Sequence, residues 1–359
     1  MAFIVGLGGL FASLGNLFKA TDFADQFEHV DWLGFHFEDF IFPLFVFIAG
    51  VSLTFSLARS VEQFGRGRAS WRLLRRCFVL FLLGIIYNGG FKAGWDPKGL
   101  EQVRWLGVLQ RIALASLFAG LLHLWLRPRW LVLVFLGLLG GYWALFAYWG
   151  NGDYREGTNI VNMFDANWLP GHRYDKFEGH YHHDPEGILS TFPAIASALL
   201  GIFAGLWLRG NASGAVKTLV LAVAGGVLLA VGWVWSPWDP ATPMDHLPWY
   251  QVPVIKKLWT PSFVLVAGGC SAGLLALFYF LIDVVGWRWL SLPWMWIGCN
   301  PITIYLLGSF LGYGALAHRL TGPATRLPEW LTWLPPAAAF AIVLLVARFL
   351  FQRRIFLRV

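Results

Sequence analysis

A histidine and several carboxylates stand close together in residues 27–50, FEHVDWLGFHFEDFIFPLFVFIAG, just ahead of a long apolar run. His29 precedes Asp39 by ten residues. An imidazole with a pKa near 6.5 takes up a proton at neutral pH, and a carboxylate can orient it. The pair therefore favours general-base chemistry with His29 as the base. Structural roles are the alternative, because the dipole at a helix start favours negative charge and loop histidines are common.

Three polar residues interrupt apolar segments. Gln110 and Arg111 lie in WLGVLQRIALASL, and Asn300 lies in WIGCNPITIYLLG. We expect Asn300 to be near the middle of one membrane-spanning helix. A charged side chain within a membrane is costly and usually faces a partner or a wet cavity. These side chains are therefore candidate substrate ligands. The alternatives are an arginine that extends to the interface and a helix–helix hydrogen bond from Asn300.

Acidic and basic residues also precede two apolar runs. In HHDPEGILSTFPAIASALLGIFAG, we expect Asp184 to cap a helix that begins at Pro185, with Glu186 in its first turn. Lys257, after Lys256, stands ahead of WTPSFVL. A lysine at a helix start opposes the helix dipole, which suggests an anionic ligand, with an interfacial anchor as the alternative. The histidines His180, His182 and His183 lack a matching second ligand group, so no metal site is predicted.

Composition identifies the elements that position these residues. The chain is 57% hydrophobic and 13% charged, whereas soluble domains carry about 25% charged residues. We expect an all-α, polytopic integral membrane helical bundle of about ten transmembrane helices in a single domain, 1–359, because backbone groups in lipid must be paired internally. The apolar stretches are roughly 2–18, 40–58, 74–91, 105–126, 130–150, 187–208, 217–235, 258–282, 289–313 and 331–351. Cys77, Cys270 and Cys299 lie in these runs, which argues against a disulfide framework.

The basic residues predict the orientation. The net charge of +7 reflects arginines in short loops, which the positive-inside rule explains better than nucleic acid binding. The loop expected after the second helix holds Arg59, Arg66, Arg68, Arg72, Arg75 and Arg76. That side is expected to be cytoplasmic and to carry both termini, with a retained first helix and a long extracytoplasmic loop at 151–186. Arg72, Arg75 and Arg76 also suit the phosphates of a cytoplasmic ligand, since arginine binds phosphate bidentately.

Taken in order, the motifs resemble one family. HVDWLG, EDFIFPLFVFIAG, GVLQRI, DPEGILST, KKLWTPSF and GCNPITIYL are similar to segments of the heparan-alpha-glucosaminide N-acetyltransferase family, over nearly the whole chain. Two departures stand out. The chain lacks the L-D-x-x-R-G segment with which members usually begin, and Gly6 stands where the first helix often carries an asparagine.

The resemblance implies acetyl transfer from cytoplasmic acetyl-CoA to the amine of glucosamine, or of a glucosamine-terminated saccharide, on the extracytoplasmic side. It identifies His29, with Trp32 and Gly34, as the active-site histidine motif, and it matches Asp39 to the aspartate that the family has shortly before a Phe-Pro pair. It also matches Gln110 and Arg111 to the family's GVLQR motif and Asp184 and Glu186 to its DPEG motif. Asn300 matches the asparagine of the family's ninth-helix motif. An amide of Asn300 or Gln110, or a tryptophan ring N–H, is expected to stabilise the oxyanion of the tetrahedral intermediate.

Other functions remain open at this stage. An amino-sugar transporter or permease uses the same buried polar residues, with helices broken at Pro43, Pro193 and Pro301. A membrane acyltransferase acting on another envelope glycan is a third possibility. The expected partners are an amino-sugar substrate and the lipid bilayer, with no nucleic acid and a possible homo-oligomer such as a dimer. The expected location is the bacterial inner (cytoplasmic) membrane.

Overall fold

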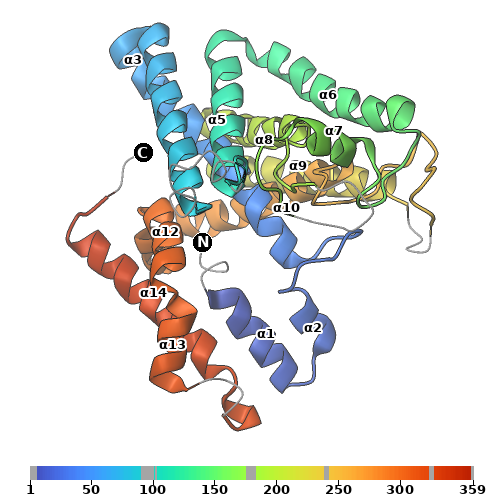
Figure 1. Ribbon diagram of the computed structural model, residues 1–359. Coiled ribbons are helices and arrows are strands. Elements are labelled where there is room, and N and C mark those ends of the chain that lie inside the picture. The colour runs from blue at the N-terminus through green and yellow to red at the C-terminus, as the bar shows by residue number, and fades with distance from the viewer. Residues whose placement is uncertain are drawn as a thin grey trace. The chain divides into compact units, whose positions relative to one another are not determined.

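The structure is a computed structural model that describes residues 6–89, 101, 103–174, 183–237, 242–322 and 327–356. Regular structure in these residues is helical, and the only β-type pairings are isolated bridges, between Leu33 and Ile255 and between Arg104 and Gly171. Figure 1 shows the helices in chain order. They are α1 (Gly8–Leu17), α2 (Thr21–Asp25), α3 (Phe37–Tyr87), α5 (Val108–Trp125), α6 (Pro128–Ala144), α7 (Ile160–Trp168), α8 (Thr191–Arg209), α9 (Gly214–Trp235), α10 (Pro261–Tyr279), α11 (Leu292–Gly298), α12 (Pro301–Leu311), α13 (Tyr313–Thr321) and α14 (Leu334–Gln352).

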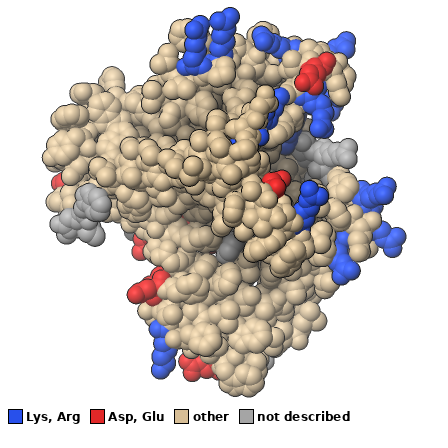
Figure 2. Space-filling view, turned by 180° about the vertical axis from the view of Figure 1, so that it is seen from behind, with Lys and Arg blue, Asp and Glu red and all other residues tan. Residues whose placement is uncertain are grey.

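Seven helices in the described part of the chain are long and apolar enough to cross a membrane. On the face drawn in Figure 2, charged side chains are sparse and most of the surface is uncharged. Large apolar side chains are exposed on the candidate spans, for example Leu219 and Val223 on α9. Such a surface is stable against lipid and not against water. The prediction of an all-α membrane protein is confirmed, while the count of about ten helices and the side of each terminus stay predictions.

The predicted loop after the second helix is wrong, because residues 59–73 are helical. The element α3 runs from Phe37 to Tyr87 and is interrupted only at Gly65, where φ is 78° and ψ is 167°. A positive φ costs little at glycine, so the chain can change direction there (Figure 1). Each arm of α3, before and after Gly65, exceeds the roughly 20 residues that a membrane crossing needs. Arg72, Arg75 and Arg76 therefore lie on a helix, in the second arm.

The chain divides into two compact units. The larger holds 31–35 and 42–277, and its core joins α3, α5, α6, α8 and α10. Small residues let helices approach closely here, as is usual where lipid removes the hydrophobic drive for helix association. A Cβ at Gly201 of α8 would lie 1.9 Å from the carbonyl oxygen of Phe47 in α3, and one at Gly50 would lie 2.1 Å from that of Ala198. The crossing of α3 and α8 therefore requires both glycines.

The smaller unit comprises Met1–Val30, His36–Ile41 and Phe278–Arg358. Its core packs Ile304 of α12, Ala317 of α13 and Val343 of α14 together. The predicted single helix over 289–313 is wrong. It is broken between α11 and α12 at Asn300, whose φ of −134° and ψ of 44° are not helical, and Pro301 then takes the first position of α12, where its missing N–H costs nothing.

Candidate functional site

His29 and Asp39 lie in the smaller unit and contact each other directly. Because α3 begins at Phe37, Asp39 is in its first turn. The Nδ1 atom of His29 lies 3.0 Å from Oδ1 of Asp39, whose side chain is 0% exposed, while that of His29 is 59% exposed. The backbone N–H groups of Val30 and His36 donate to Oδ2 of Asp39 at 3.2 and 3.1 Å. The carboxylate is thus held in place by the chain around it.

This geometry determines what the pair can do. An ionised carboxylate only accepts hydrogen bonds, so Nδ1 of His29 carries a proton when it bonds to Asp39. In the neutral ring, Nε2 then has the lone pair that accepts a proton. A histidine oriented by a carboxylate in this way is the usual arrangement of a general base. The sequence prediction that these two residues pair is confirmed, and their catalytic role remains a proposal.

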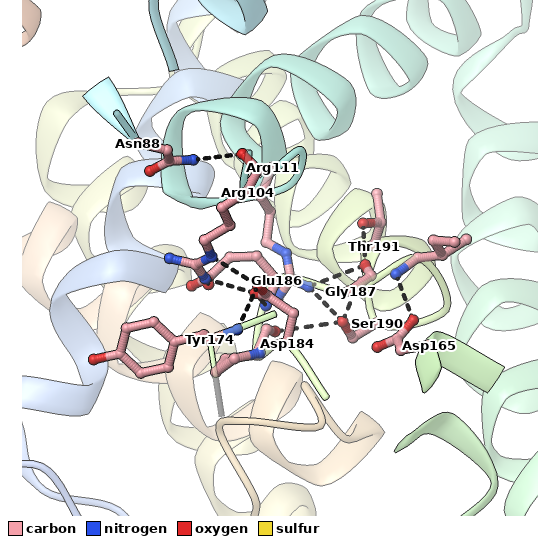
Figure 3. A network of polar contacts seen from close by, with 12 residues as sticks. Asn88, Arg104, Arg111, Asp165, Tyr174, Asp184, Glu186, Gly187, Ser190 and Thr191 are labelled. Atoms are coloured by element: carbon pink, nitrogen blue, oxygen red, sulfur yellow. Dashed lines mark hydrogen bonds and ion pairs between the residues drawn. The ribbon is translucent and has the colours of Figure 1, made fainter. Parts of the chain in front are cut away.

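A second polar site lies in the larger unit, around Arg104 (Figure 3). Arg104 precedes α5, and its guanidinium binds Asp184 bidentately, from Nε to Oδ2 at 2.7 Å and from Nη2 to Oδ1 at 2.5 Å. Its Nη2 also donates to Glu186, and its guanidinium carbon lies 4.7 Å from the ring centre of Tyr174. The expectation that Asp184 caps a helix is wrong, because α8 begins at Thr191. The carboxylate binds Arg104 instead of a helix end.

Charge in this cluster is not balanced within it. Burial by itself lowers the pKa of Arg104, but the hydrogen bond to Asp184 and the charges of Glu186 and Asp184 raise it overall. Burial raises the pKa of Glu186, Arg104 opposes that rise and Asp184 adds to it. One guanidinium therefore serves two carboxylates. When both carboxylates are ionised, the three hydrogen-bonded side chains retain one negative charge, and the nearby Arg111 also opposes the rise in the pKa of Glu186. An ammonium group suits the two carboxylates that share Arg104.

Gln110 and Arg111 are buried in the first turns of α5, as the sequence suggested. Arg111 does not extend to an interface. Its Nη2 donates to the hydroxyl of Ser190 and, at 3.4 Å, to the carbonyl of Gly187, and its guanidinium carbon lies 4.8 Å from the ring centre of Trp259. Within the described residues, its Nε and Nη1 and both amide atoms of Gln110 have no hydrogen-bond partner. An embedded cation with unpaired N–H groups is typical of a ligand site.

Asp165 of α7 is a buried carboxylate that lies next to this site and that the sequence analysis did not select. Its Oδ1 accepts the N–H of Ile188 at 3.0 Å, and its Oδ2 has no partner among the residues that the structure describes. Burial raises its pKa from 3.8 to about 7, although the bond from Ile188 and the charge of Arg111 act in the opposite direction. A buried carboxyl group near neutrality is a functional-site candidate. The α7 helix has nine residues and is outside the candidate spans.

Lys257 forms an ion pair within the larger unit. Its Nζ lies 2.6 Å from Oε1 of Glu156 and 5.7 Å from the ring centre of Trp32. The Trp32 ring also packs edge-on against the buried His183, and its Nε1 donates to the carbonyl of Tyr154 at 2.9 Å. The ion pair explains the lysine without an anionic ligand, so a substrate role for Lys257 stays a prediction. His180 and His182, considered above as metal ligands, lie outside the described residues.

The remaining predicted residues are separate from these clusters. Asn300 lies in the smaller unit, where its Nδ2 donates to the carbonyl of Ile355 at 2.9 Å and so ties the break before α12 to the segment after α14. Of the two amides expected as oxyanion donors, that of Asn300 donates to a carbonyl group, and that of Gln110 has no partner in the described structure. The prediction named no particular tryptophan, and the ring N–H of Trp32 donates to a carbonyl group. Arg72, Arg75 and Arg76 are exposed and spaced so that they share one face of α3.

Arg104, Asp165 and Trp259 are functional candidates that sequence reasoning missed. Arg104 stands in EQVRWLGVLQR, just outside an apolar run, where a positive charge has an ordinary explanation. Asp165 and Asn162 are three residues apart in NIVNMFDANW, which is the spacing of one helix face. That spacing indicates a shared face only if the segment is helical, and the long loop gave no reason to expect a helix there. Trp259 has a positive φ of 54°, which the sequence does not reveal.

Comparison with known proteins identifies relatives of this chain. The family described as "Heparan-alpha-glucosaminide N-acetyltransferase, catalytic" matches residues 17–232, which is more than half of the chain. A Homo sapiens protein named heparan-alpha-glucosaminide N-acetyltransferase is 29% identical over 384 residues, which cover 93% of this chain and 56% of the human protein. The Mus musculus protein of the same name is 26% identical over 330 residues, covering 78% and 48% respectively. The chain thus spans about half the length of the curated relatives it matches.

Proposed function

The chain belongs to the heparan-alpha-glucosaminide N-acetyltransferase catalytic family, and on that premise we propose that it transfers acetyl from acetyl-CoA to the amine of glucosamine or of a glucosamine-terminated saccharide. The observation that carries the proposal is the 3.0 Å contact between His29 and the buried Asp39. The matched region includes both residues, together with Arg111, Asp184 and Glu186. Lys257 and Asn300 lie beyond it.

The proposed chemistry needs a base because a protonated amine has no lone pair. The Nε2 atom of His29 accepts a proton from the ammonium group, and Asp39 stabilises the imidazolium that forms. The neutral nitrogen attacks the thioester carbonyl, the C–N bond forms and the C–S bond breaks. The nitrogen loses its second proton as the amide forms, and the departing thiolate takes up one proton to give free CoA. A positioned acid–base group of this kind contributes roughly 10²- to 10⁴-fold in rate.

We assign recognition of the positively charged acceptor to Asp184 and Glu186. Two carboxylates share the single guanidinium of Arg104, so the cluster attracts a cation. Arg104 keeps Asp184 in position through two parallel hydrogen bonds, the geometry that gives arginine–carboxylate pairs their directionality. We expect Asp184→Asn and Glu186→Gln to raise the KM for glucosamine more than they lower kcat.

The acetyl donor carries phosphate groups, and we assign them to the exposed face of Arg72, Arg75 and Arg76. Three guanidinium groups on one face of a helix provide the bidentate donors that phosphate favours. Positive-inside topology accounts for the same residues without a ligand. Arg75→Gln should therefore raise the KM for acetyl-CoA and leave the KM for glucosamine unchanged if the assignment is right. Equal KM values for acetyl-CoA would leave only the topological role.

We further propose that donor and acceptor bind on opposite sides of the membrane. The first arm of α3, about 28 residues, is about 42 Å long as a helix, which is enough to cross the bilayer. His29 precedes one end of this arm, and Arg66 and Arg68 follow its other end at Gly65. Cysteine substitutions at His29 and Arg68 should react with a membrane-impermeant thiol reagent from opposite sides of right-side-out vesicles, after the native cysteines are replaced.

Purified protein in liposomes tests the enzyme against the transporter. Labelled acetyl-CoA and glucosamine should give acetylated glucosamine, with no net uptake of sugar when acetyl-CoA is absent. Uptake without acetyl-CoA would support the transporter, which the buried, unpaired N–H groups of Arg111 also suit. A panel of other amino-sugar acceptors in the same assay separates glucosamine from a different envelope glycan.

A further inference from the structure

The larger unit contains a set of buried polar atoms that nothing in the described chain satisfies. Both amide atoms of Asn162, Oδ2 of Asp165, and Nε and Nη1 of Arg111 have no hydrogen-bond partner among the described residues. Asn162 and Asp165 are 0% exposed, and Arg111 is 1% exposed. Most buried polar groups in native proteins are paired, because an unpaired one keeps the full cost of leaving water. Five such atoms on three side chains point to an occupant.

Local structure fixes these side chains in place. Asn159 caps α7 by accepting the N–H groups of Val161 and Asn162 through Oδ1 at 3.1 and 3.0 Å. Asn162 and Asp165 follow at i and i+3 and share one helix face. The carboxylate of Asp165 packs against the backbone of Gly187, since a Cβ at Gly187 would lie 1.8 Å from its Oδ2. The α7 helix therefore places Asn162 and Asp165 on one face, and the bond from the N–H of Ile188 holds the Asp165 carboxylate.

Arg111 reaches the same stretch of backbone from α5. It donates to the carbonyl of Gly187 and to the Ser190 hydroxyl, while Asp165 accepts the N–H of Ile188. Figure 3 shows Arg111 and Asp165 meeting the segment from Gly187 to Ser190. The two are also close enough to interact electrostatically, since the charge of Arg111 opposes the rise that burial causes in the pKa of Asp165. Arg111 and Asp165 thus belong to one polar region, and Asn162 shares the α7 face of Asp165.

The hydrogen-bonding capacity of the unpaired atoms indicates which chemical class of ligand fits them. Arg111 offers N–H donors, Asp165 offers an acceptor, and Asn162 offers one of each. A free anion would be repelled by Asp165 and by the neighbouring Asp184, and a free cation would be repelled by Arg111. A hydroxyl group both donates and accepts, so several hydroxyls on one ring match the set without a net charge.

We propose that Asn162 and Asp165 of α7, with Arg111 of α5, form a subsite for the ring hydroxyl groups of a sugar. The inference rests on the proposed function, because the sugar would be the acceptor whose amine is acetylated. It adds a specificity element to that function. The subsite recognises the hydroxylated ring and is distinct from the base that serves the amine. Amines without ring hydroxyls should therefore bind poorly.

Equilibrium binding in the absence of acetyl-CoA tests the subsite without turnover. Isothermal titration of the purified full chain in detergent would use glucosamine and cyclohexylamine, which keeps a six-membered ring and the amine but has no hydroxyls. The variants are Asp165→Asn and Asn162→Ala, and Asp153→Asn is the matched control. Asp153 lies in the same loop, and its carboxylate pairs with the exposed Arg155 instead of joining this network.

We expect the wild-type chain and Asp153→Asn to bind glucosamine at least about tenfold more tightly than cyclohexylamine. Asp165→Asn and Asn162→Ala should lose most of that preference. Equal binding of the two probes by the wild type, or no binding of glucosamine at all, overturns the inference, and so does an unchanged preference in both variants. Equal binding of the two probes by the wild-type chain overturns the inference even when neither variant folds. An inactive but sugar-binding protein would refute the proposed function and leave the subsite standing.

Discussion

Replacing Asp165 with Asn should change how stability depends on pH. Burial raises the pKa of Asp165 from 3.8 to about 7, so the folded protein holds a proton on this carboxyl over a pH range in which the unfolded chain has released it. Stability then falls as pH rises from about 4 to about 7 and is constant above that range, because the unfolded state binds fewer protons. A shift of about 3 pKa units corresponds to about 4 kcal/mol at 1.36 kcal/mol per unit.

Asn removes this cost and leaves the shape of the site almost unchanged. It cannot ionise, and its amide oxygen can still accept the N–H of Ile188, which lies 3.0 Å from Asp165 Oδ1. At pH 8 we therefore expect Asp165→Asn to be more stable than the wild type, by up to about 4 kcal/mol. At pH 5, which is about 1.2 units above the unfolded pKa, the difference should shrink to about 1.6 kcal/mol. A functional carboxyl that costs stability is a common trade-off in active sites.

Thermal unfolding in detergent, followed by tryptophan fluorescence at several pH values between 5 and 8, measures this difference. Asp153→Asn is the control, because the pKa of Asp153 is shifted in the opposite direction. Burial raises that pKa, but the hydrogen bonds that Asp153 accepts from Arg155 and Thr158 lower it overall. A depressed pKa contributes stability above the unfolded value, so this variant should not flatten the profile. The reasoning is refuted if wild type and Asp165→Asn show the same slope between pH 5 and pH 8.

Two further predictions concern packing and charge. Gly201→Ala should separate α3 from α8 and destabilise the fold by roughly 2–4 kcal/mol. Gly226→Ala on α9 is the control, because an added Cβ there meets nothing within 4 Å, and it should be neutral or stabilising by up to about 1 kcal/mol. Equal unfolding temperatures for the two variants would contradict the close crossing of α3 and α8. Arg104→Gln should destabilise by roughly 3–5 kcal/mol because it leaves two carboxylates without a cation, and adding Glu186→Gln should recover part of that loss in the same melts. No recovery in the double variant would argue against a shared charge.

The fold was predictable from composition because lipid leaves few choices for a backbone. Low charge content and long apolar runs require helices, and the ends of α5, α8, α9 and α14 agree with the runs that predicted them to within a few residues. The errors fall where local rules compete. An arginine-rich segment was expected to be a loop, yet arginine is a good helix former, and only Gly65 interrupts α3.

Site residues were predictable where two local features of the sequence agreed. They were missed where contacts between distant parts of the chain determine the role of a residue. Asp39 follows His29 by ten residues and lies in the first turn of a helix, and both features can be read locally. Asp184 before Pro185 fits the pattern of a helix cap equally well, but the bidentate contact with Arg104, 80 residues away in the sequence, determines its role. Apart from its three-residue spacing from Asn162, Asp165 gives no local sign that it is buried. Its importance follows from the unsatisfied oxygen and from the neighbouring Arg111, which only the folded chain brings together.

The most direct test of the catalytic proposal is the rate of acetyl transfer from labelled acetyl-CoA to glucosamine by purified wild type, His29→Ala and Asp39→Asn. The account predicts product from the wild type. It also predicts losses of roughly 10²- to 10⁴-fold in kcat for both variants, with unfolding temperatures and glucosamine binding close to those of the wild type for His29→Ala. Turnover by a folded His29→Ala at the wild-type rate would contradict the assignment of His29 as the base.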